Sequence, residues 1–279
     1  MTHKTKAKSK VKITVIFIAL LIIFLFMILV YKIFSSTTFM KNYYEVEPRI
    51  EEVEKSKQED TGPSRTVGWL RVQGTNIDLP IVFVEKGKRD IDSYPVEKEK
   101  YVWLMDRDDK FHNKILISGH NIFNLSAQPK IDSAMFKRLE ELMAFVYYDF
   151  AKENKYFQIT LDGKEYLYQI FAVDFAHSSD IKVFPDGDNS KSDIKKQIKM
   201  YKDDSLYDYD VDVDENDKIA TVITCTRFFG EYGETTFGIT GKLIDKNGRN
   251  YDYKVTKSKK YEEIEKKLKG DDEDETDSV

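Results

Sequence analysis

The only cysteine of the chain, Cys225, stands in the stretch ITCTRFF, residues 223–229, at the end of an apolar run. A thiolate is a strong nucleophile, and a nearby histidine or arginine lowers the pKa of a thiol from its reference value of about 8.5. A lone cysteine can also be a small buried hydrophobe. The end of a predicted strand favours a reactive thiol, because binding and catalytic groups gather where rigid elements give way to loops.

Four histidines are available as a base for this thiol. His3 precedes an apolar N-terminal segment, and His112 lies in a charged stretch that predicts a solvated turn. His120 and His177 each follow a predicted strand. We favour His120 as the partner of Cys225, because it directly follows a glycine, which lets the chain turn sharply. Their distance in sequence requires the fold to bring the two strand ends together.

Arg227 is the nearest cation to the thiol in the sequence. Residues i and i+2 of a strand face the same side, so its guanidinium is expected beside Cys225. There it would stabilise a thiolate or the oxyanion of an acyl-transfer intermediate. A solvated surface arginine is the alternative.

Short apolar runs separated by turn residues begin near residue 66 and predict a mostly β barrel or sandwich. Asp162-Gly163 between two alternating runs is a strong hairpin signal, and Pro80 favours an edge or a bulge in its strand. Apolar residues at helical spacing predict helices over 133–143 and 189–202. The predicted strands are 67–72, 77–84, 114–118, the hairpin 156–176, 218–229 and 234–244.

The N-terminus has the pattern of a membrane anchor. Five lysines lie within residues 1–12, and residues 13–31 carry no charge. About 20 apolar residues span a bilayer as a helix, and the lysines place the N-terminus in the cytoplasm. We therefore expect a cytoplasmic tail over 1–12, a transmembrane anchor over 13–34 and an exported remainder; a cleaved signal peptide is the weaker alternative.

The remaining boundaries follow from composition. Residues 35–65 are highly charged and predict a stalk, 66–256 form the predicted catalytic domain, and 257–279 predict a charged, disordered tail. The net charge of −5 argues against nucleic acid as a partner. A single cysteine excludes an intramolecular disulfide and a structural zinc site built on several cysteines.

Taken together, the motifs resemble those of the sortases, the cysteine transpeptidases of Gram-positive surfaces. TVITC with its following arginine resembles the sortase signature T-L-x-T-C. Four further stretches are similar to class B members in the same order, and the resemblance covers about 66–245. These are GWLRVQGTNIDLPIV (68–82), ILISGHN (115–121), DSAMFKRLEEL (132–142) and FGITGKLI (237–244).

The resemblance implies a closed β-barrel in which Cys225 is the nucleophile and His120 the general acid or base. The enzyme would cut a C-terminal sorting motif of a surface protein or pilin and hold it as a thioacyl-enzyme. A cell-wall peptide or a pilin lysine would then accept the acyl group, without a metal or other cofactor. Thr224, Thr226 and Asn121 flank the pair and are the expected substrate-binding or oxyanion residues.

One departure keeps other functions open. The family carries its catalytic arginine on the strand after the cysteine, where this chain has about Thr236. Arg227 is the only nearby substitute; otherwise the oxyanion would rely on backbone N–H groups such as those of Thr226 or Phe228. The alternatives are a cysteine peptidase that releases surface proteins, and a non-catalytic sortase-fold assembly factor.

Overall fold

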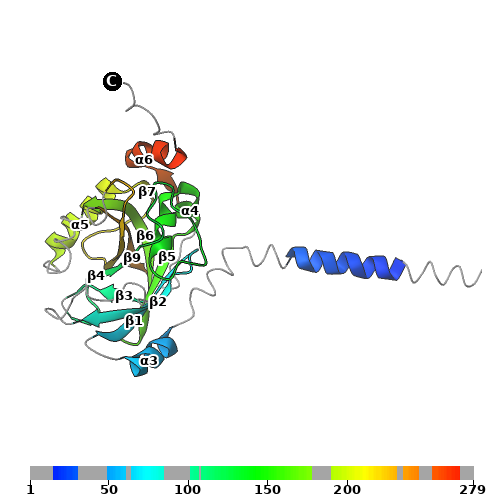
Figure 1. Ribbon diagram of the computed structural model, residues 1–279, viewed down its shortest axis with the longest axis horizontal. Coiled ribbons are helices and arrows are strands. Elements are labelled where there is room, and N and C mark those ends of the chain that lie inside the picture. The colour runs from blue at the N-terminus through cyan, green and yellow to red at the C-terminus, as the bar shows by residue number, and fades with distance from the viewer. Residues whose placement is uncertain are drawn as a thin grey trace, which may run out of the picture. The chain divides into compact units, whose positions relative to one another are not determined.

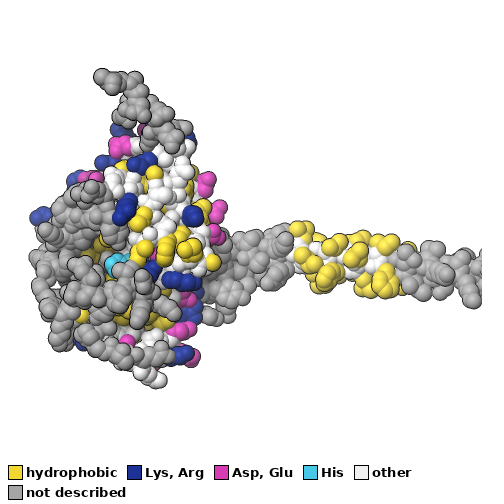
Figure 2. Space-filling model, viewed as in Figure 1, with side chains coloured by type: hydrophobic (Ala, Val, Ile, Leu, Met, Phe, Trp, Pro, Cys, Tyr) yellow, Lys and Arg dark blue, Asp and Glu magenta, His cyan; other side chains and the backbone are white. Residues whose placement is uncertain are grey.

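A computed structural model of the protein shows two compact units, Met1–Glu47 and Pro48–Val279. It describes residues 15–30, 49–60, 64–84, 101–106, 108–177, 190–230, 235–244 and 253–270. In the first unit, residues 15–30 form a helix whose apolar side chains are exposed (Figure 2). Among the described residues, no helix has both the length and the apolar character needed to cross a bilayer.

Eight strands of the second unit close into a barrel in the order β1-β2-β3-β4-β8-β9-β6-β5 (Figure 1). Most neighbours are antiparallel, but β2 pairs with β3, and β4 with β8, in parallel. The barrel strands are β1 (Ser64–Val72), β2 (Asp78–Val84), β3 (Val102–Leu104), β4 (Lys114–Gly119), β5 (Tyr156–Leu161), β6 (Lys164–His177), β8 (Ile219–Thr226) and β9 (Thr235–Ile244). The sequence-based expectation of a mostly β, closed barrel is confirmed.

Helices and a small second sheet pack around the barrel. Two short strands pair antiparallel to form that sheet, and α5 packs on β6. The elements are α3 (Ile50–Glu59), the 3₁₀ helix η2 (Glu140–Val146), α4 (Tyr148–Glu153), α5 (Lys191–Asp204), β7 (Tyr207–Tyr209), β10 (Val255–Lys257) and α6 (Lys259–Lys269).

The barrel wall has a packed inner face and a partly covered outer face. Alternate strand residues point inward, where side chains such as those of Leu70, Ile117 and Val222 are fully buried. Burying one such side chain contributes about 1.5–3 kcal/mol to folding. On the outer face, Tyr201 of α5 accepts a hydrogen bond from Thr221 of β8 at 3.0 Å, which places α5 outside the barrel.

Local turn chemistry explains several elements that the sequence predicts. Asp162 and Gly163 have φ values of 53° and 67°, as a two-residue hairpin turn between β5 and β6 requires. The Ser190 hydroxyl accepts from the Asp193 N–H and caps α5. Pro80 is not on an edge strand, but its part of β2 pairs only with β1, because β3 pairs no earlier than Ile81.

The prediction of a helix over 133–143 is wrong. Residues 133–139 are irregular, and the helical segment η2 begins at Glu140. The Glu140 carboxylate accepts hydrogen bonds from the backbone N–H groups of Lys137 and Arg138. A side chain that bonds the local backbone in this way competes with helical hydrogen bonds.

The predicted disordered tail needs a correction as well. Within 257–279, residues 259–269 form α6, which buries Tyr261 and Ile264. The N-cap Ser258 accepts from the Lys260 N–H, and Gly270 ends the helix in a left-handed conformation with φ 75°. The expected anchor over 13–34, the stalk over 35–65 and the end of the tail lie partly outside the described residues. Within the expected stalk, α3 packs on β1 and buries Val53.

Candidate active site

The parallel pairing of β4 with β8 brings the two main sequence candidates together. The register aligns Gly119 with Thr224, the residues that directly precede His120 and Cys225. Parallel strands end at the same edge of a sheet. His120 and Cys225 therefore each follow one member of the last aligned pair of two neighbouring strands, a placement that suits acyl transfer by a Cys–His pair.

His120 is held from two sides. Its carbonyl accepts a hydrogen bond from the Leu139 N–H at 3.2 Å, and its ring centroid lies 5.0 Å from that of Trp103, with the planes at 84°. The preceding Gly119 has no positive φ, contrary to the expected sharp turn. A Cβ there would lie 3.0 Å from Leu139 and from Val102, so the glycine is needed for close packing.

The other neighbour of Cys225 is Thr236 of β9, the position at which the resemblance would place an arginine. Thr236 is buried, and its hydroxyl donates to the Ala176 carbonyl of β6 at 3.2 Å. The row of Cys225, Thr236 and Ala176 therefore contains no lysine or arginine. Any cation that acts on the thiol has to come from outside this row.

Arg227 occupies such an outside position. The strand β8 ends at Thr226, so the alternation that predicted its side does not extend to Arg227. Arg227 is exposed and starts a turn, in which its carbonyl accepts from the Gly230 N–H at 3.2 Å. The Phe228 N–H donates to the Thr226 hydroxyl at 3.0 Å, so this expected oxyanion donor already has an acceptor.

The three flanking candidates have partners inside the protein. The buried Thr224 hydroxyl donates to the Gly119 carbonyl at 2.7 Å and ties β8 to β4. The buried Asn121 amide donates to the Asn124 carbonyl at 3.0 Å and accepts from its N–H at 3.1 Å. These contacts give the residues a role in shaping the site, and their expected contacts to substrate remain predictions.

The other histidines of the second unit lie elsewhere. His112 precedes β4, at the end opposite His120, and its Nε2 lies 2.6 Å from Asp108 Oδ1. His177 ends β6 and pairs with Thr235, one row beyond Cys225 and two strands away. Position thus favours His120 as the partner of the thiol.

A buried carboxyl group, that of Asp174, lies on the same face of the sheet as Cys225, two residues along the strands from the row of Cys225. Asp174 of β6 pairs with Gly238, and Gly238 pairs with Ile223, two residues before Cys225. Burial, with a smaller contribution from the charge of Asp204, raises the pKa of Asp174 to about 7. Its Oδ1 has no hydrogen-bond partner among the described residues. Sequence reasoning missed Asp174, because only strand pairing reveals its row.

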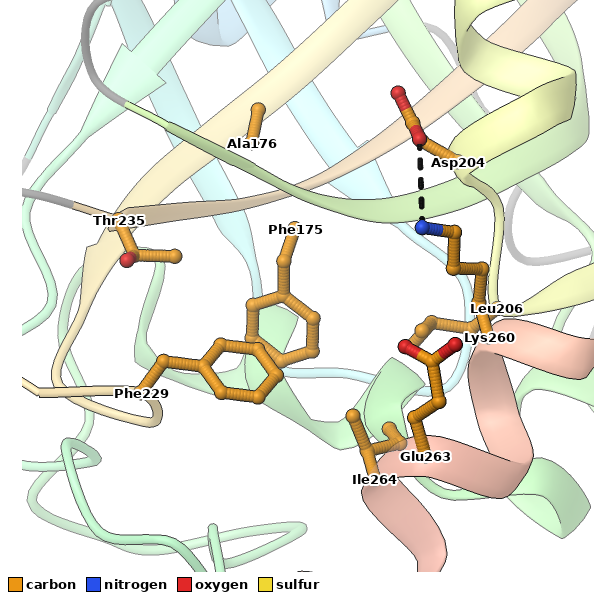
Figure 3. Close-up of a pocket in the computed structure, with 9 residues that line it drawn as sticks. All are labelled: Phe175, Ala176, Asp204, Leu206, Phe229, Thr235, Lys260, Glu263 and Ile264. Atoms are coloured by element: carbon orange, nitrogen blue, oxygen red, sulfur yellow. Dashed lines mark ion pairs between the residues drawn. The ribbon is translucent and has the colours of Figure 1, made fainter.

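The cavity in Figure 3 meets the row of Cys225 at one residue, Ala176. It has a volume of about 260 Å³, and one edge is bridged by Lys260 and Asp204 with 3.9 Å between their charged atoms. Phe175 and Thr235 in its wall belong to the rows next to that of Cys225, and Cys225 itself is not among the lining residues. It is lined by Phe175, Ala176, Asp204, Leu206, Phe229, Thr235, Lys260, Glu263 and Ile264.

No metal site is recognisable in the part of the chain that the structure describes, where no three His, Cys, Asp or Glu side chains are suitably grouped. The arrangement of Cys225 and His120 suits covalent acyl transfer, in which the imidazole moves a proton and the thiol forms the bond.

No protein-family model matches the sequence. No curated protein matches it either. Solved structures do match. Clostridium perfringens sortase B is 22% identical over 71% of this chain and 98% of its own, with a TM-score of 0.52. Staphylococcus aureus sortase B is 19% identical over 77% and 93%, with a TM-score of 0.53. Sortase B from the type II pilus of Streptococcus pneumoniae is 20% identical over 64% and 92%, with a TM-score of 0.50. The chain therefore has the sortase B fold.

Proposed function

We propose that the chain is a membrane-anchored extracellular cysteine transpeptidase. It cleaves a C-terminal sorting motif of surface proteins or pilins and transfers the acyl part to an amine. The observation that carries the proposal is the parallel pairing of β4 with β8, whose last aligned residues, Gly119 and Thr224, directly precede His120 and Cys225. The sortase B fold supports the same chemistry.

The reaction has two half-reactions. The Cys225 sulfur attacks the scissile carbonyl, His120 gives a proton to the leaving amine, and a thioester remains on the sulfur. An incoming amine then attacks the thioester, His120 removes a proton from that amine, and the thiolate leaves. Arg227 is the proposed stabiliser of the oxyanion in both steps.

The proposed location follows from the N-terminus. Residues 15–30 form a helix with exposed apolar side chains, and five lysines precede it. A single span with a cytoplasmic N-terminus would hold the barrel outside the cell. The acceptor is a cell-wall peptide or a pilin lysine, and one similar structure comes from a pilus system.

A second candidate is a sortase-fold assembly factor without catalysis. Its support is the buried Thr236 in the row of Cys225 and the position of Arg227 beyond the strand end. A hydrolase that releases surface proteins shares the first half-reaction with the transpeptidase, so only the acceptor separates those two.

The decisive experiment is intact-mass measurement of the full chain, purified in detergent, with peptides bearing LPxTG-like or NPxTx-like motifs. We expect a thioacyl adduct that Cys225→Ala abolishes and His120→Ala nearly abolishes, because each removes one member of the reacting pair. Cys225→Ala is a small change and should leave the thermal unfolding midpoint close to that of the wild type.

The acceptor decides among the candidates. Transfer of the adduct to an added amine, with little release to water, supports the transpeptidase, and release to water alone supports the hydrolase. If no peptide gives an adduct and Cys225→Ala leaves surface-protein attachment in cells unchanged, the assembly factor is favoured.

A further inference from the structure

Trp103 is the side chain that packs against the imidazole of His120. Their ring centroids lie 5.0 Å apart and their planes meet at 84°, an edge-to-face arrangement that is favourable for aromatic rings. Trp103 is only 5% exposed. It pairs with Ser118, two residues before His120, so both rings lie on the outer face of β3 and β4.

Trp103 does not belong to the main core of the barrel. It forms a separate apolar cluster with Val82 and Val84 of β2, against which Tyr101 and Met105 pack. The register pairs Val82 with Trp103, so β2 supports the indole from the side away from His120. Tyr101 adds a second edge-to-face contact, with 5.7 Å between its ring centroid and that of Trp103.

His120, which the indole of this cluster contacts, also has a main chain held by a hydrogen bond. The His120 carbonyl is held by the Leu139 N–H, which fixes the main chain, and the indole then restricts where the ring can turn. A general base must lie within hydrogen-bond reach of the atom it serves. A displacement of about 1 Å can slow such a reaction by about 100-fold.

We propose that Trp103 is a positioning residue that sets the imidazole of His120 toward Cys225. The inference rests on the proposed acyl transfer, in which His120 moves the proton. Trp103 itself does not contact the reacting atoms in this assignment. Within the apolar cluster on β2 and β3, Trp103 is the member whose ring packs against the imidazole.

The test measures thioacyl formation by the full chain in detergent, with the variants Trp103→Leu, Trp103→Phe and Val84→Ala. We expect Trp103→Leu to lower the rate constant of acylation by about 10- to 100-fold at an unchanged KM. Trp103→Phe retains an aromatic ring and should recover to within about threefold of the wild type. Val84→Ala weakens the same cluster without touching His120 and serves as the matched control.

A second comparison separates positioning from packing. In the His120→Ala background, Trp103→Leu should have no further effect, because the indole then has no ring to hold. A further loss in that background, or an equal loss in Val84→Ala, would overturn the proposal. So would a Trp103→Leu rate within threefold of an active wild type. If Trp103→Leu does not fold, Trp103→Met takes its place under the same criteria.

Failure of the proposed function has a different signature. If the wild type forms no adduct with any peptide, the alkylation of Cys225 by iodoacetamide is followed between pH 5 and 9. We expect Trp103→Leu to move the midpoint of that profile by at least about half a pH unit, and Trp103→Phe to restore it. Profiles that coincide in all three proteins would refute the role of Trp103 independently of any substrate.

Discussion

Cys225 pairs with the uncharged Thr236 of β9, and on its other side His120 directly follows the end of β4. The former carbonyl oxygen of a tetrahedral intermediate would carry negative charge, and the row of Cys225, Thr236 and Ala176 offers no lysine or arginine to balance it. Arg227, two residues beyond the thiol, is long enough to reach back, although it starts outside the strand. In the proposed mechanism, the stabilisation of the oxyanion by a side chain therefore depends on the exposed Arg227.

Replacing Arg227 tests this directly. Loss of one oxyanion donor costs about 10²–10³ in rate in a well-characterised protease, so we expect a decrease of that size in kcat/KM for Arg227→Ala. Arg227→Lys keeps the charge but loses the planar fork of donors, so its kcat/KM should lie between that of the wild type and that of Arg227→Ala. The measurement is amine transfer by the full chain, and a decrease below about threefold in Arg227→Ala would remove Arg227 from the mechanism.

At the scale of elements, local sequence signals predicted many of the barrel strands. They did not predict which strands pair with one another. Asp162-Gly163 specifies its hairpin by turn chemistry alone, and the apolar run of β8 is visible in the sequence. The neighbours of Cys225 are not visible, because a strand pairs with partners far away in sequence. The place of His120 after a predicted strand and a glycine, together with the resemblance, pointed to that residue, but nothing local pointed to Trp103 or Asp174.

The helix over 133–143 failed for a related reason. Its apolar spacing is helical, but the Glu140 side chain bonds the backbone before it, and the Leu139 N–H donates to the His120 carbonyl. The segment is thus fixed by its contact with the candidate site. Periodicity contains no information about such a contact.

The packing of α5 on β6 places Asp174 in a setting that costs stability when its carboxyl ionises. Burial raises the pKa of Asp174 from its ordinary value of 3.8 to about 7. Between these values the folded protein keeps a proton that the unfolded chain has lost. The free energy of unfolding therefore falls as the pH rises through this window and is level above it.

Asp174→Asn removes this titration. We expect the variant to exceed the wild type in free energy of unfolding by up to about 4 kcal/mol at pH 8, and the difference to shrink toward pH 4. Urea unfolding at several pH values measures it. Burial also raises the pKa of Asp106 to about 7. Asp106 is present in the wild type and in Asp174→Asn, so its contribution cancels in the difference between their free energies of unfolding. A difference that stays constant between pH 4 and 8 would contradict the assignment to Asp174.

At the scale of the whole molecule, the C-terminal part extends the second unit beyond the last barrel strand. β10 pairs with β7, and α6 buries Tyr261 and Ile264 against that region. The Tyr148 hydroxyl donates to the Val255 carbonyl at 3.0 Å, which ties α4 to β10. Charge composition alone predicted a tail here, because lysines and glutamates on the exposed side of α6 mask its short apolar stripe.

Two truncations separate the helix from the acidic residues after it. Deleting 271–279 leaves α6 with its Gly270 cap, whose N–H donates to the carbonyls of Lys266 and Lys267, so we expect thioacyl formation within twofold of the wild type and an unchanged unfolding midpoint. Deleting 259–279 exposes the surface that covers Tyr261 and Ile264, at a cost of about 1.5–3 kcal/mol for each buried side chain lost. Thermal unfolding and intact-mass measurement on both proteins test this. A large loss of activity in the shorter deletion would mean that the acidic residues take part in function, because no packed side chain described in the fold is removed with them.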